Sequence, residues 1–224
     1  MQFDFRTLTA AERYKILIGT VVPRPIAWVT TLSRGGARNA APFSFFNAMS
    51  KDPPLVALGV QANTRGDMKD TGRNILDTGE FVVNLVPHAL AEPMSFTSYE
   101  APSEVDELEA ADIETTASVV VRPPRIALSP VAFECRLHTH LEVSPNHLIV
   151  LGEVVYAHIA DEAMLDPEKF YIDTPKLDLI GRMHGRGWYA ATHDLFQIER
   201  PPDEALRPKG IQSTTSNSNQ KRES

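Results

Sequence analysis

The chain contains a single cysteine, Cys135, in 224 residues. One cysteine excludes an internal disulfide and a cysteine-based metal cluster, and it suits a reducing compartment. No apolar run approaches the roughly 20 residues that a membrane-spanning helix requires. The N-terminus, MQFDFRTL, mixes charged with apolar residues and therefore lacks the pattern of a signal peptide. These absences predict a cytoplasmic protein without a membrane partner.

Positive charge is also scarce, since 22 Lys and Arg face 29 Asp and Glu, for a formal net charge of -7. A nucleic-acid backbone requires clustered Lys and Arg, so we do not expect a nucleic-acid partner. Several common signatures are missing as well: GxGxxG after a strand, the Walker lysine loop, the GxSxG elbow and HExxH. The usual nucleotide-binding and hydrolase interpretations are therefore excluded.

The composition that remains is that of an ordinary globular protein, with 42% hydrophobic and 23% charged residues. This length can bury a core as one domain, which we place at residues 1–200. Residues 213–224 contain no apolar side chain, so nothing offsets the entropy of ordering them. We predict a disordered C-terminal tail over residues 201–224.

Helix signals are few. Thr9 and Glu12 have the spacing of a capping box, which predicts a helix from about residue 10 to 18 that stops at Gly19. A second helix is expected after Asp67, its predicted cap, and before Gly79. Residues 88–99 are a weaker candidate because Pro93 interrupts them. The acidic stretch 100–114, which has no Lys or Arg, is predicted to be a solvated loop or a short helix.

Strand signals dominate the rest of the chain. Residues 26–32 and 38–43 flank Gly35-Gly36 as a hairpin, and short apolar strands are expected at 55–60 and 81–85. Residues 131–143 and 147–159 form a second, longer hairpin. In its first strand the side chains alternate, so the face that carries Glu134, Arg136, His138, His140 and Glu142 should meet solvent or a partner chain.

Cys135 belongs to the opposite, apolar face of that strand, where a buried small hydrophobe is expected. His138 and His140 lie two residues apart, which raises the question of a metal. No third ligand has a recognisable spacing, so we expect no metal site and interpret both histidines as surface or interface residues.

Three polar segments are suited to holding a phosphate and a flat aromatic ring. The first, residues 24–47, ends in the polar-aromatic cluster PFSFFN, and Pro23 and Pro25 hold Arg24 extended before it. The second, residues 63–74, places cations and hydroxyls on a loop that enters a helix, where free backbone N–H groups favour anions. The third is the basic loop GRMHGRG at residues 181–187, with Arg182, His184 and Arg186.

These segments resemble the flavin reductase-like family, which has an FMN-binding split β-barrel and includes flavoredoxins and the reductases of two-component flavin monooxygenases. The similar motifs are RPIAWVTT from Arg24, NxAPFSFFN from Asn39, DPPLV from Asp52, KDTxxN from Lys69 and TGEFVVN from Thr78. PPRIALSPVAFEC at 123–135 and LGEVVYAHI at 151–159 continue the match. The resemblance covers about residues 20–200, and its strength lies in the order of many modest motifs.

The resemblance implies a mainly β fold, an FMN-binding split β-barrel with a few flanking helices. It also implies bound FMN, with FAD a weaker expectation, and hydride transfer from NADH or NADPH to the flavin. A homodimer with the flavin near its interface is expected, and a monooxygenase or another electron acceptor is a possible partner. The same likeness leaves two alternatives, a flavoredoxin-like FMN electron carrier that acts with a protein partner and a flavin-binding module without nicotinamide turnover. A flavin-free binding module that kept the barrel is a further alternative, from another class.

Site residues follow from the same resemblance. Ser44 and Asn47, with backbone N–H groups around Phe45 and Phe46, are expected against the flavin ring, where donors stabilise developing negative charge. Lys69 and Thr71 are expected at the phosphate, with Arg24 next. Thr30 or Thr31 is expected on the ribityl chain, and Trp28 or Phe45 as a wall of the ring. Arg182, in the closing loop at residues 181–187, is also expected to bind the cofactor. His184 in that loop either gates the nicotinamide or simply fills the site.

Each assignment has an ordinary alternative on residue type alone. Ser44 and Asn47 are typical of turns, and Lys69 and Thr71 are typical of a solvated helix start. Trp28 in an alternating strand is most often a core residue, and a lone arginine such as Arg24 is most often at the surface.

Overall fold

The computed structural model describes residues 1–100, 102, 105–185 and 187–200. The chain divides into two units, residues 1–193 and 194–224. In the second unit, residues 194–200 form neither helix nor strand, and the predicted tail at 201–224 lies outside the described residues.

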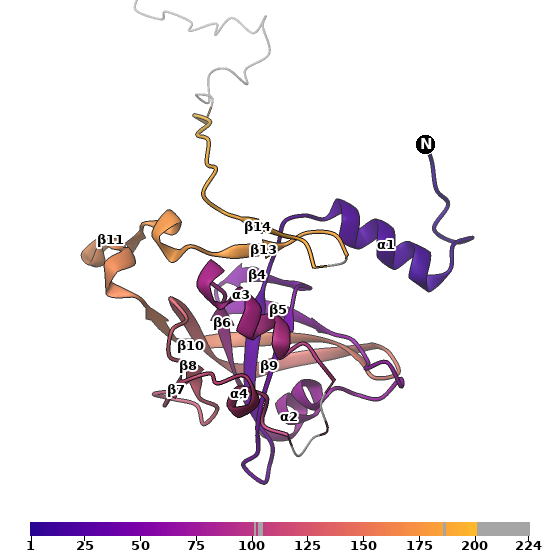
Figure 1. Cartoon of the computed structure of the whole chain (residues 1–224), viewed down its shortest axis with the longest axis horizontal. Coiled ribbons are helices and arrows are strands. Elements are labelled where there is room, and N and C mark those ends of the chain that lie inside the picture. The colour runs from indigo at the N-terminus through magenta and orange to yellow at the C-terminus, as the bar shows by residue number, and fades with distance from the viewer. Residues whose placement is uncertain (101, 103–104, 186, 201–224) are drawn as a thin grey trace, which may run out of the picture. The chain divides into compact units, whose positions relative to one another are not determined.

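The first unit is built on one antiparallel sheet of seven strands in the order β3-β2-β6-β9-β10-β5-β4 (Figure 1). The strands are β2 (Ala27–Leu32), β3 (Arg38–Phe43), β4 (Phe46–Lys51), β5 (Pro54–Val60), β6 (Glu80–Leu85), β9 (Val131–Ser144) and β10 (His147–Ile159). The mainly β fold predicted from the sequence is confirmed, and so are both predicted hairpins. The strand β4 has no counterpart among the predicted elements.

The core lies on both faces of the central strands, which is why β2 is buried along nearly its whole length. Val29 belongs to one cluster with Leu58, Phe81 and Cys135. Trp28 points to the other face, into a second cluster with Met94, Leu108 and Ile126. The predicted burial of Cys135 is confirmed, and burial raises the pKa of its thiol far above the usual range.

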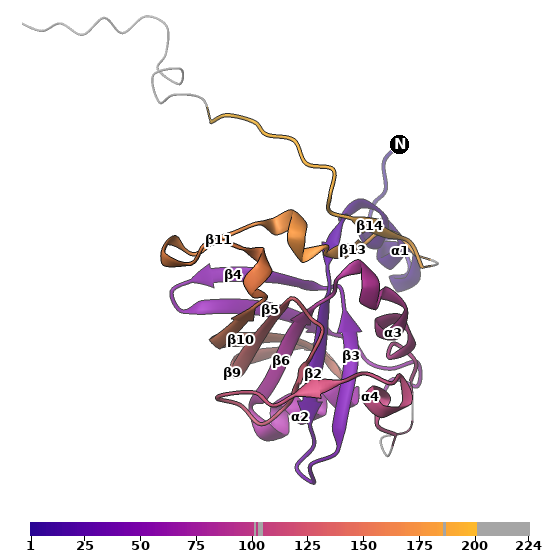
Figure 2. The same ribbon diagram turned by 60° about the vertical axis from the view of Figure 1, so that its left-hand side comes forward.

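The two longer helices are α1 (Ala10–Thr20), which buries none of its residues, and α2 (Asp70–Thr78), which packs against β2 (Figure 2). The Thr9–Glu12 capping box of α1 is confirmed, although the helix runs past Gly19. Gly79 ends α2 in the left-handed conformation with φ 72°, as predicted. The predicted cap is wrong: Lys69 is the N-cap residue, and Asp67 instead donates its backbone N–H to Oδ1 of Asn63.

The remaining elements are short. The weak helix candidate forms η1 (His88–Leu90) and α3 (Ala91–Phe96), which tolerates Pro93 because that residue lies in its first turn. The acidic stretch forms α4 (Glu107–Ala110). The others are β1 (Arg24–Pro25), β7 (Thr115–Thr116), β8 (Arg125–Ile126), η2 (Asp161–Ala163), β11 (Met164–Asp166), η3 (Pro167–Lys169), β12 (Tyr171–Ile172), η4 (Thr174–Leu177), β13 (Ile180–Arg182) and β14 (Tyr189–Ala191).

The face of β9 predicted to meet solvent or a partner chain is exposed at Arg136, His138, His140 and Glu142, and Glu134 is the exception. Its side chain is 0% exposed, because residues 118–121 cover this end of the strand. The carboxylate accepts the backbone N–H groups of Val119 (2.7 Å), Val120 (2.6 Å) and Val121 (3.1 Å), and it lies 2.7 Å from Nε2 of His158. A buried carboxylate thus ties a loop to the sheet, since each of these donors needs an acceptor away from water.

Gly152 on β10 allows Phe81 of the core to approach the backbone closely. A Cβ atom at this position would lie 2.3 Å from Cζ of Phe81, whose side chain is fully buried. Gly152→Ala should therefore lower the free energy of unfolding by about 1–3 kcal/mol, as overpacking does in other cores. Chemical denaturation measures the change. Gly19→Ala is the control, because nothing lies within 4 Å of its added Cβ; equal stability of both variants would contradict the packing argument.

Candidate functional site

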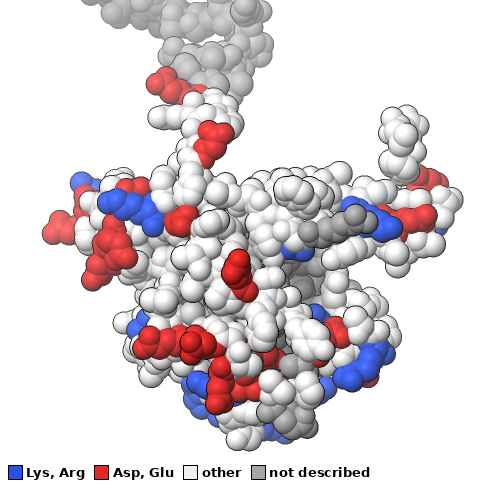
Figure 3. All heavy atoms as spheres, viewed as in Figure 1, with Lys and Arg blue, Asp and Glu red and all other residues white. Residues whose placement is uncertain are grey.

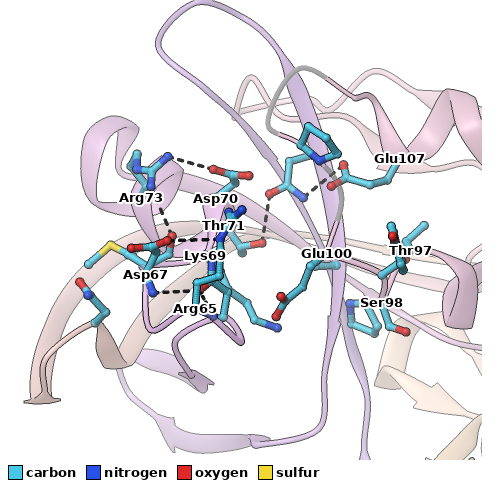
Figure 4. A pocket seen from close by; sticks show the side chains of 18 residues that line it. Arg65, Asp67, Lys69, Asp70, Thr71, Arg73, Thr97, Ser98, Glu100 and Glu107 are labelled. Carbon is cyan, nitrogen blue, oxygen red and sulfur yellow. Dashed lines mark hydrogen bonds and ion pairs between the residues drawn. The ribbon is translucent and has the colours of Figure 1, made fainter.

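A cavity of about 550 Å³ lies where β3, the start of α2 and the segment after α3 meet (Figure 4). Its volume falls within the range of small-molecule and cofactor sites. The lining residues come from four places in the sequence: Asn39, Ala41 and Pro42 on β3; Asn63, Arg65, Asp67–Thr71 and Arg73 around the start of α2; Thr97–Glu100, Pro102 and Glu107; and Asn146 in the β9–β10 turn.

One wall of the cavity is an edge of the sheet, because among the described strands β3 pairs with β2 alone. The backbone N–H of Ala40 points outward from this edge and donates to Oε2 of Glu107 at 3.3 Å. Two residues on, Pro42 has no N–H to offer. Glu107 also accepts from Nδ2 of Asn39 at 3.4 Å, and burial raises the pKa of its carboxyl group. The acidic stretch is therefore not simply a solvated loop, since Glu107 covers part of the sheet edge.

The opposite side of the cavity carries three cations, Arg65, Lys69 and Arg73, together with carboxylates that partly neutralise them. Arg65 pairs with Asp67 at 3.5 Å, and Arg73 pairs with Asp70 at 3.0 Å. Lys69, in contrast, has no carboxylate within 4.0 Å among the residues that the structure describes. It is the N-cap residue of α2, and its side chain makes no capping hydrogen bond. A cation beside a helix N-terminus is a favourable place for an anion.

Thr71 contributes to this site indirectly. The residue is only 1% exposed, and its hydroxyl donates to Oδ1 of Asn39 at 3.2 Å. It thereby fixes the amide of Asn39 at the cavity wall. The sequence motif contained Asn39, but reasoning from residue types did not select it, because its importance depends on this contact across 32 residues.

Three predicted ligand contacts are corrected by burial. Trp28, Thr30 and Thr31 are 0% exposed, so they offer no surface to a ligand. Nε1 of Trp28 donates to Oγ1 of Thr97 at 2.9 Å, and the hydroxyl of Thr30 donates to the carbonyl of Pro124. Thr31 accepts from Nδ2 of Asn74 at 3.0 Å. All three residues stabilise the interior of the protein. For Trp28, a place in the core is the alternative that its residue type alone predicts.

Arg24 is buried and already bonded. Four of the five guanidinium N–H donors have acceptors: the carbonyls of Ile18, Val21 and Met183 and the hydroxyl of Ser44. The arginine is 6% exposed and does not line the cavity. Its predicted phosphate contact is thus replaced by a structural role, in which it joins the end of α1 to the loop after β13.

The cluster Ser44–Asn47 lies away from the cavity for a topological reason. β3 and β4 stand at opposite edges of the sheet order, and the chain crosses between them at Ser44 and Phe45. Phe45 meets Tyr14 edge-on with ring centroids 6.3 Å apart. Phe46 packs against the core, and Oδ1 of exposed Asn47 accepts the N–H of Ala48 at 2.8 Å. Within one chain, Ala41 and Pro42 line the cavity instead of these residues.

The closing loop forms a separate aromatic cluster. The guanidinium of Arg182 stacks over the Tyr189 ring at 4.6 Å. The His184 ring stacks on Trp188 with centroids 5.7 Å apart and planes 15° apart. Neither Arg182 nor His184 lines the cavity, and Arg186 lies outside the described residues. A gating role for His184 stays a prediction.

The sequence matches the family model described as "Flavin reductase like domain" over residues 18–174. The chain belongs to the flavin reductase-like family. Solved structures agree: it is 34% identical to 2-nitrobenzoate 2-nitroreductase NbaA of Pseudomonas fluorescens, with a TM-score of 0.83 over 94% of this chain and 100% of the other. Nitrilotriacetate monooxygenase component B of Bacillus cereus is 31% identical, with a TM-score of 0.81 over 88% and 98%.

The fold expected from the resemblance is confirmed by the same comparison. A putative flavin reductase with a split barrel domain from Shewanella frigidimarina superposes with a TM-score of 0.76 over 90% of this chain and all of its own. At 20% identity that likeness concerns the fold alone. The seven-stranded sheet with its flanking helices is accordingly a flavin reductase-like split barrel.

The cavity suits the flavin that this family binds. A flavin mononucleotide needs a cationic end for its phosphate and a less polar wall with hydrogen-bonding groups for its ring. Lys69 and the start of α2 supply the first, and Asn39, Ala41 and Pro42 on the sheet edge supply the second. The residues of the cavity therefore fit the cofactor.

Two other types of site have no support among the described residues. No three His, Cys, Asp or Glu side chains come together there as a metal ion would require. None of the helices in this part of the chain is both long and apolar enough to cross a membrane. Acidic side chains gather over α4 in Figure 3, where Glu109, Asp112 and Glu114 line a second cavity.

Proposed function

We propose that this protein binds FMN in the cavity beside β3 and α2 and acts as an FMN-dependent oxidoreductase that takes hydride from NADH or NADPH. The observation that carries the proposal is the pairing of an available cation, Lys69, with the start of α2 at one side of the cavity and a free sheet edge at the other. Membership of the flavin reductase-like family supports the cofactor class.

Some of the cavity residues bind the phosphate of FMN, and others orient the rest of the cofactor. Lys69 and Arg65, with the first backbone N–H groups of α2, hold the phosphate, and the amide of Asn39 hydrogen-bonds the ribityl chain or the ring. Ala41 and Pro42 limit where the ring can lie. When bound, FMN supplies the hydride acceptor, and no acidic or basic side chain is needed for the transfer. The protein contributes orientation and a fixed electrostatic environment.

A homodimer is part of the proposal. Large apolar side chains are exposed at the far end of the β9–β10 hairpin, with Leu141 at 60%, Val143 at 55% and Ile149 at 40%. A second copy of the chain would cover such a surface. The name of the Bacillus cereus relative, a monooxygenase component, motivates a monooxygenase as one possible electron acceptor.

Anaerobic absorption spectroscopy tests the proposal. The purified protein should be yellow or become so with added FMN, and NADH or NADPH should bleach the bound flavin within seconds. Bleaching by dithionite but by neither nicotinamide would favour the flavoredoxin-like electron carrier. A protein that stays colourless and gains no thermal stability from FMN would contradict both and leave the flavin-free module.

A further inference from the structure

Glu100 places a carboxylate at the cationic side of the cavity. Its Oε1 and Oε2 accept the backbone N–H of Thr64 at 2.9 and 3.2 Å, and Oε2 also accepts the Thr64 hydroxyl. Thr64 lies between Asn63 and Arg65, which both line the cavity, as Glu100 does itself. In Figure 4 the Glu100 side chain points toward the Lys69 side chain.

The surroundings of this carboxylate favour its ionised form. The Thr64 hydroxyl has the largest effect in lowering the pKa of Glu100 below its usual value, and the backbone N–H of Thr64 with the charges of Lys69 and Arg65 adds to it. Glu100 is therefore an anion throughout the neutral range, in an environment of one backbone N–H, one hydroxyl and two cations.

That set of donors is also what binds a phosphate monoester. Backbone N–H groups, a hydroxyl and Lys or Arg recur at phosphate sites because each charge-assisted hydrogen bond is stronger than its neutral counterpart. Glu100 lies in the segment after α3, whereas these donors and cations belong to residues 64–69. A ligand phosphate and the Glu100 carboxylate would thus compete for the same partners.

We propose that Glu100 is an internal anion that occupies part of the phosphate subsite and is displaced when a phosphorylated flavin binds. The inference rests on the proposed function, since it takes the Lys69 side of the cavity as the phosphate end. Its consequence is weaker binding of the phosphate than the cations alone would give. This competition keeps the cofactor exchangeable, because it weakens binding of the phosphate and leaves recognition of the flavin ring unchanged.

Titrations of FMN and riboflavin test the inference, because the two ligands differ only by the phosphate. Glu100→Gln should lower the Kd for FMN about three- to tenfold, a range set by the modest strength of exposed charge pairs. The Kd for riboflavin should stay unchanged. Glu92→Gln is the matched control: Glu92 is an exposed glutamate of α3 that does not line the cavity, and its loss should alter neither Kd.

The outcomes separate the two proposals. If wild-type protein binds FMN but Glu100→Gln binds it equally or more weakly, or binds riboflavin more tightly by the same factor, Glu100 is not a competitor of the phosphate. If wild-type protein binds neither flavin, the proposed function fails and this inference with it. Thermal melts of both variants verify folding. At equal fractional saturation with FMN, inorganic phosphate should displace FMN from Glu100→Gln at a lower concentration than from the wild type.

Discussion

Replacing Glu134 with alanine is expected to lower the free energy of unfolding by about 3–5 kcal/mol, because each buried hydrogen-bond donor left without its acceptor costs about 1–3 kcal/mol. The substitution leaves the N–H groups of residues 119–121 and the ring of His158 without their acceptor. For a domain of this size the melting temperature should fall by roughly 2–4 °C per kcal/mol. Urea denaturation gives the free energy directly.

The control for this substitution is Glu162→Ala, which removes an exposed glutamate. It should change the stability by no more than about 0.5 kcal/mol, as surface substitutions usually do. A loss below about 1 kcal/mol in Glu134→Ala would mean that residues 118–121 hold their place without the carboxylate.

The contribution of Glu134 should also depend on pH. Burial alone would raise the pKa of this carboxyl group, but the hydrogen bonds from His158 and from the backbone of residues 119–121 outweigh burial and lower the pKa below its usual 4.5. A group with a lowered pKa stabilises the folded state above its unfolded pKa and loses that effect as the pH falls. The stability gap between wild type and Glu134→Ala should therefore be constant near neutrality and narrow as the pH drops below 4.5.

The second large effect concerns ligand affinity. Lys69→Ala should raise the Kd for FMN about tenfold to hundredfold, because hydrogen bonds to charged groups contribute roughly 1.5–3 kcal/mol. Riboflavin has no phosphate and should bind as before. Fluorescence titration measures both ligands, and Lys15→Ala on exposed α1 is the control for loss of a positive charge.

Adding Thr71→Ala to Lys69→Ala should weaken FMN binding further, since Asn39 then loses the hydroxyl that fixes it. An unchanged FMN affinity in the double variant would place the phosphate elsewhere. The change in Lys69→Ala is opposite in sign to that expected for Glu100→Gln, because one variant removes a cation and the other removes an anion from the same side of the cavity.

The sequence predicted those features whose causes are local. The capping box at Thr9 and Glu12 and the turn at Gly79 depend on residues within a few positions of each other, and both were confirmed. The alternation along β9 also placed Cys135 correctly in the core. Lys69 and Thr71 were selected because a loop that enters a helix is itself a local signal, and both residues line the cavity.

The errors arise where distant segments meet. Glu134 was expected at the surface because alternation says nothing about what covers a face, and residues 118–121 cover it. The expected contact of Ser44 and Asn47 with the flavin ring stays a prediction, and in a single chain neither residue lines the cavity. Thr30 and Thr31 were assigned to a ligand although both are satisfied by buried partners.

The way in which the edge of β3 is covered has a consequence for the solubility of the protein. A strand with one unpaired side can recruit strands from other molecules and start a polymer. Here Pro42 removes one donor and Glu107, on the four-residue helix α4, occupies the donor of Ala40. The short acidic helix α4 thus protects the edge of β3 from aggregation. Substitutions that disrupt α4 should first cause precipitation during expression. The molecules that remain folded should still bind flavin.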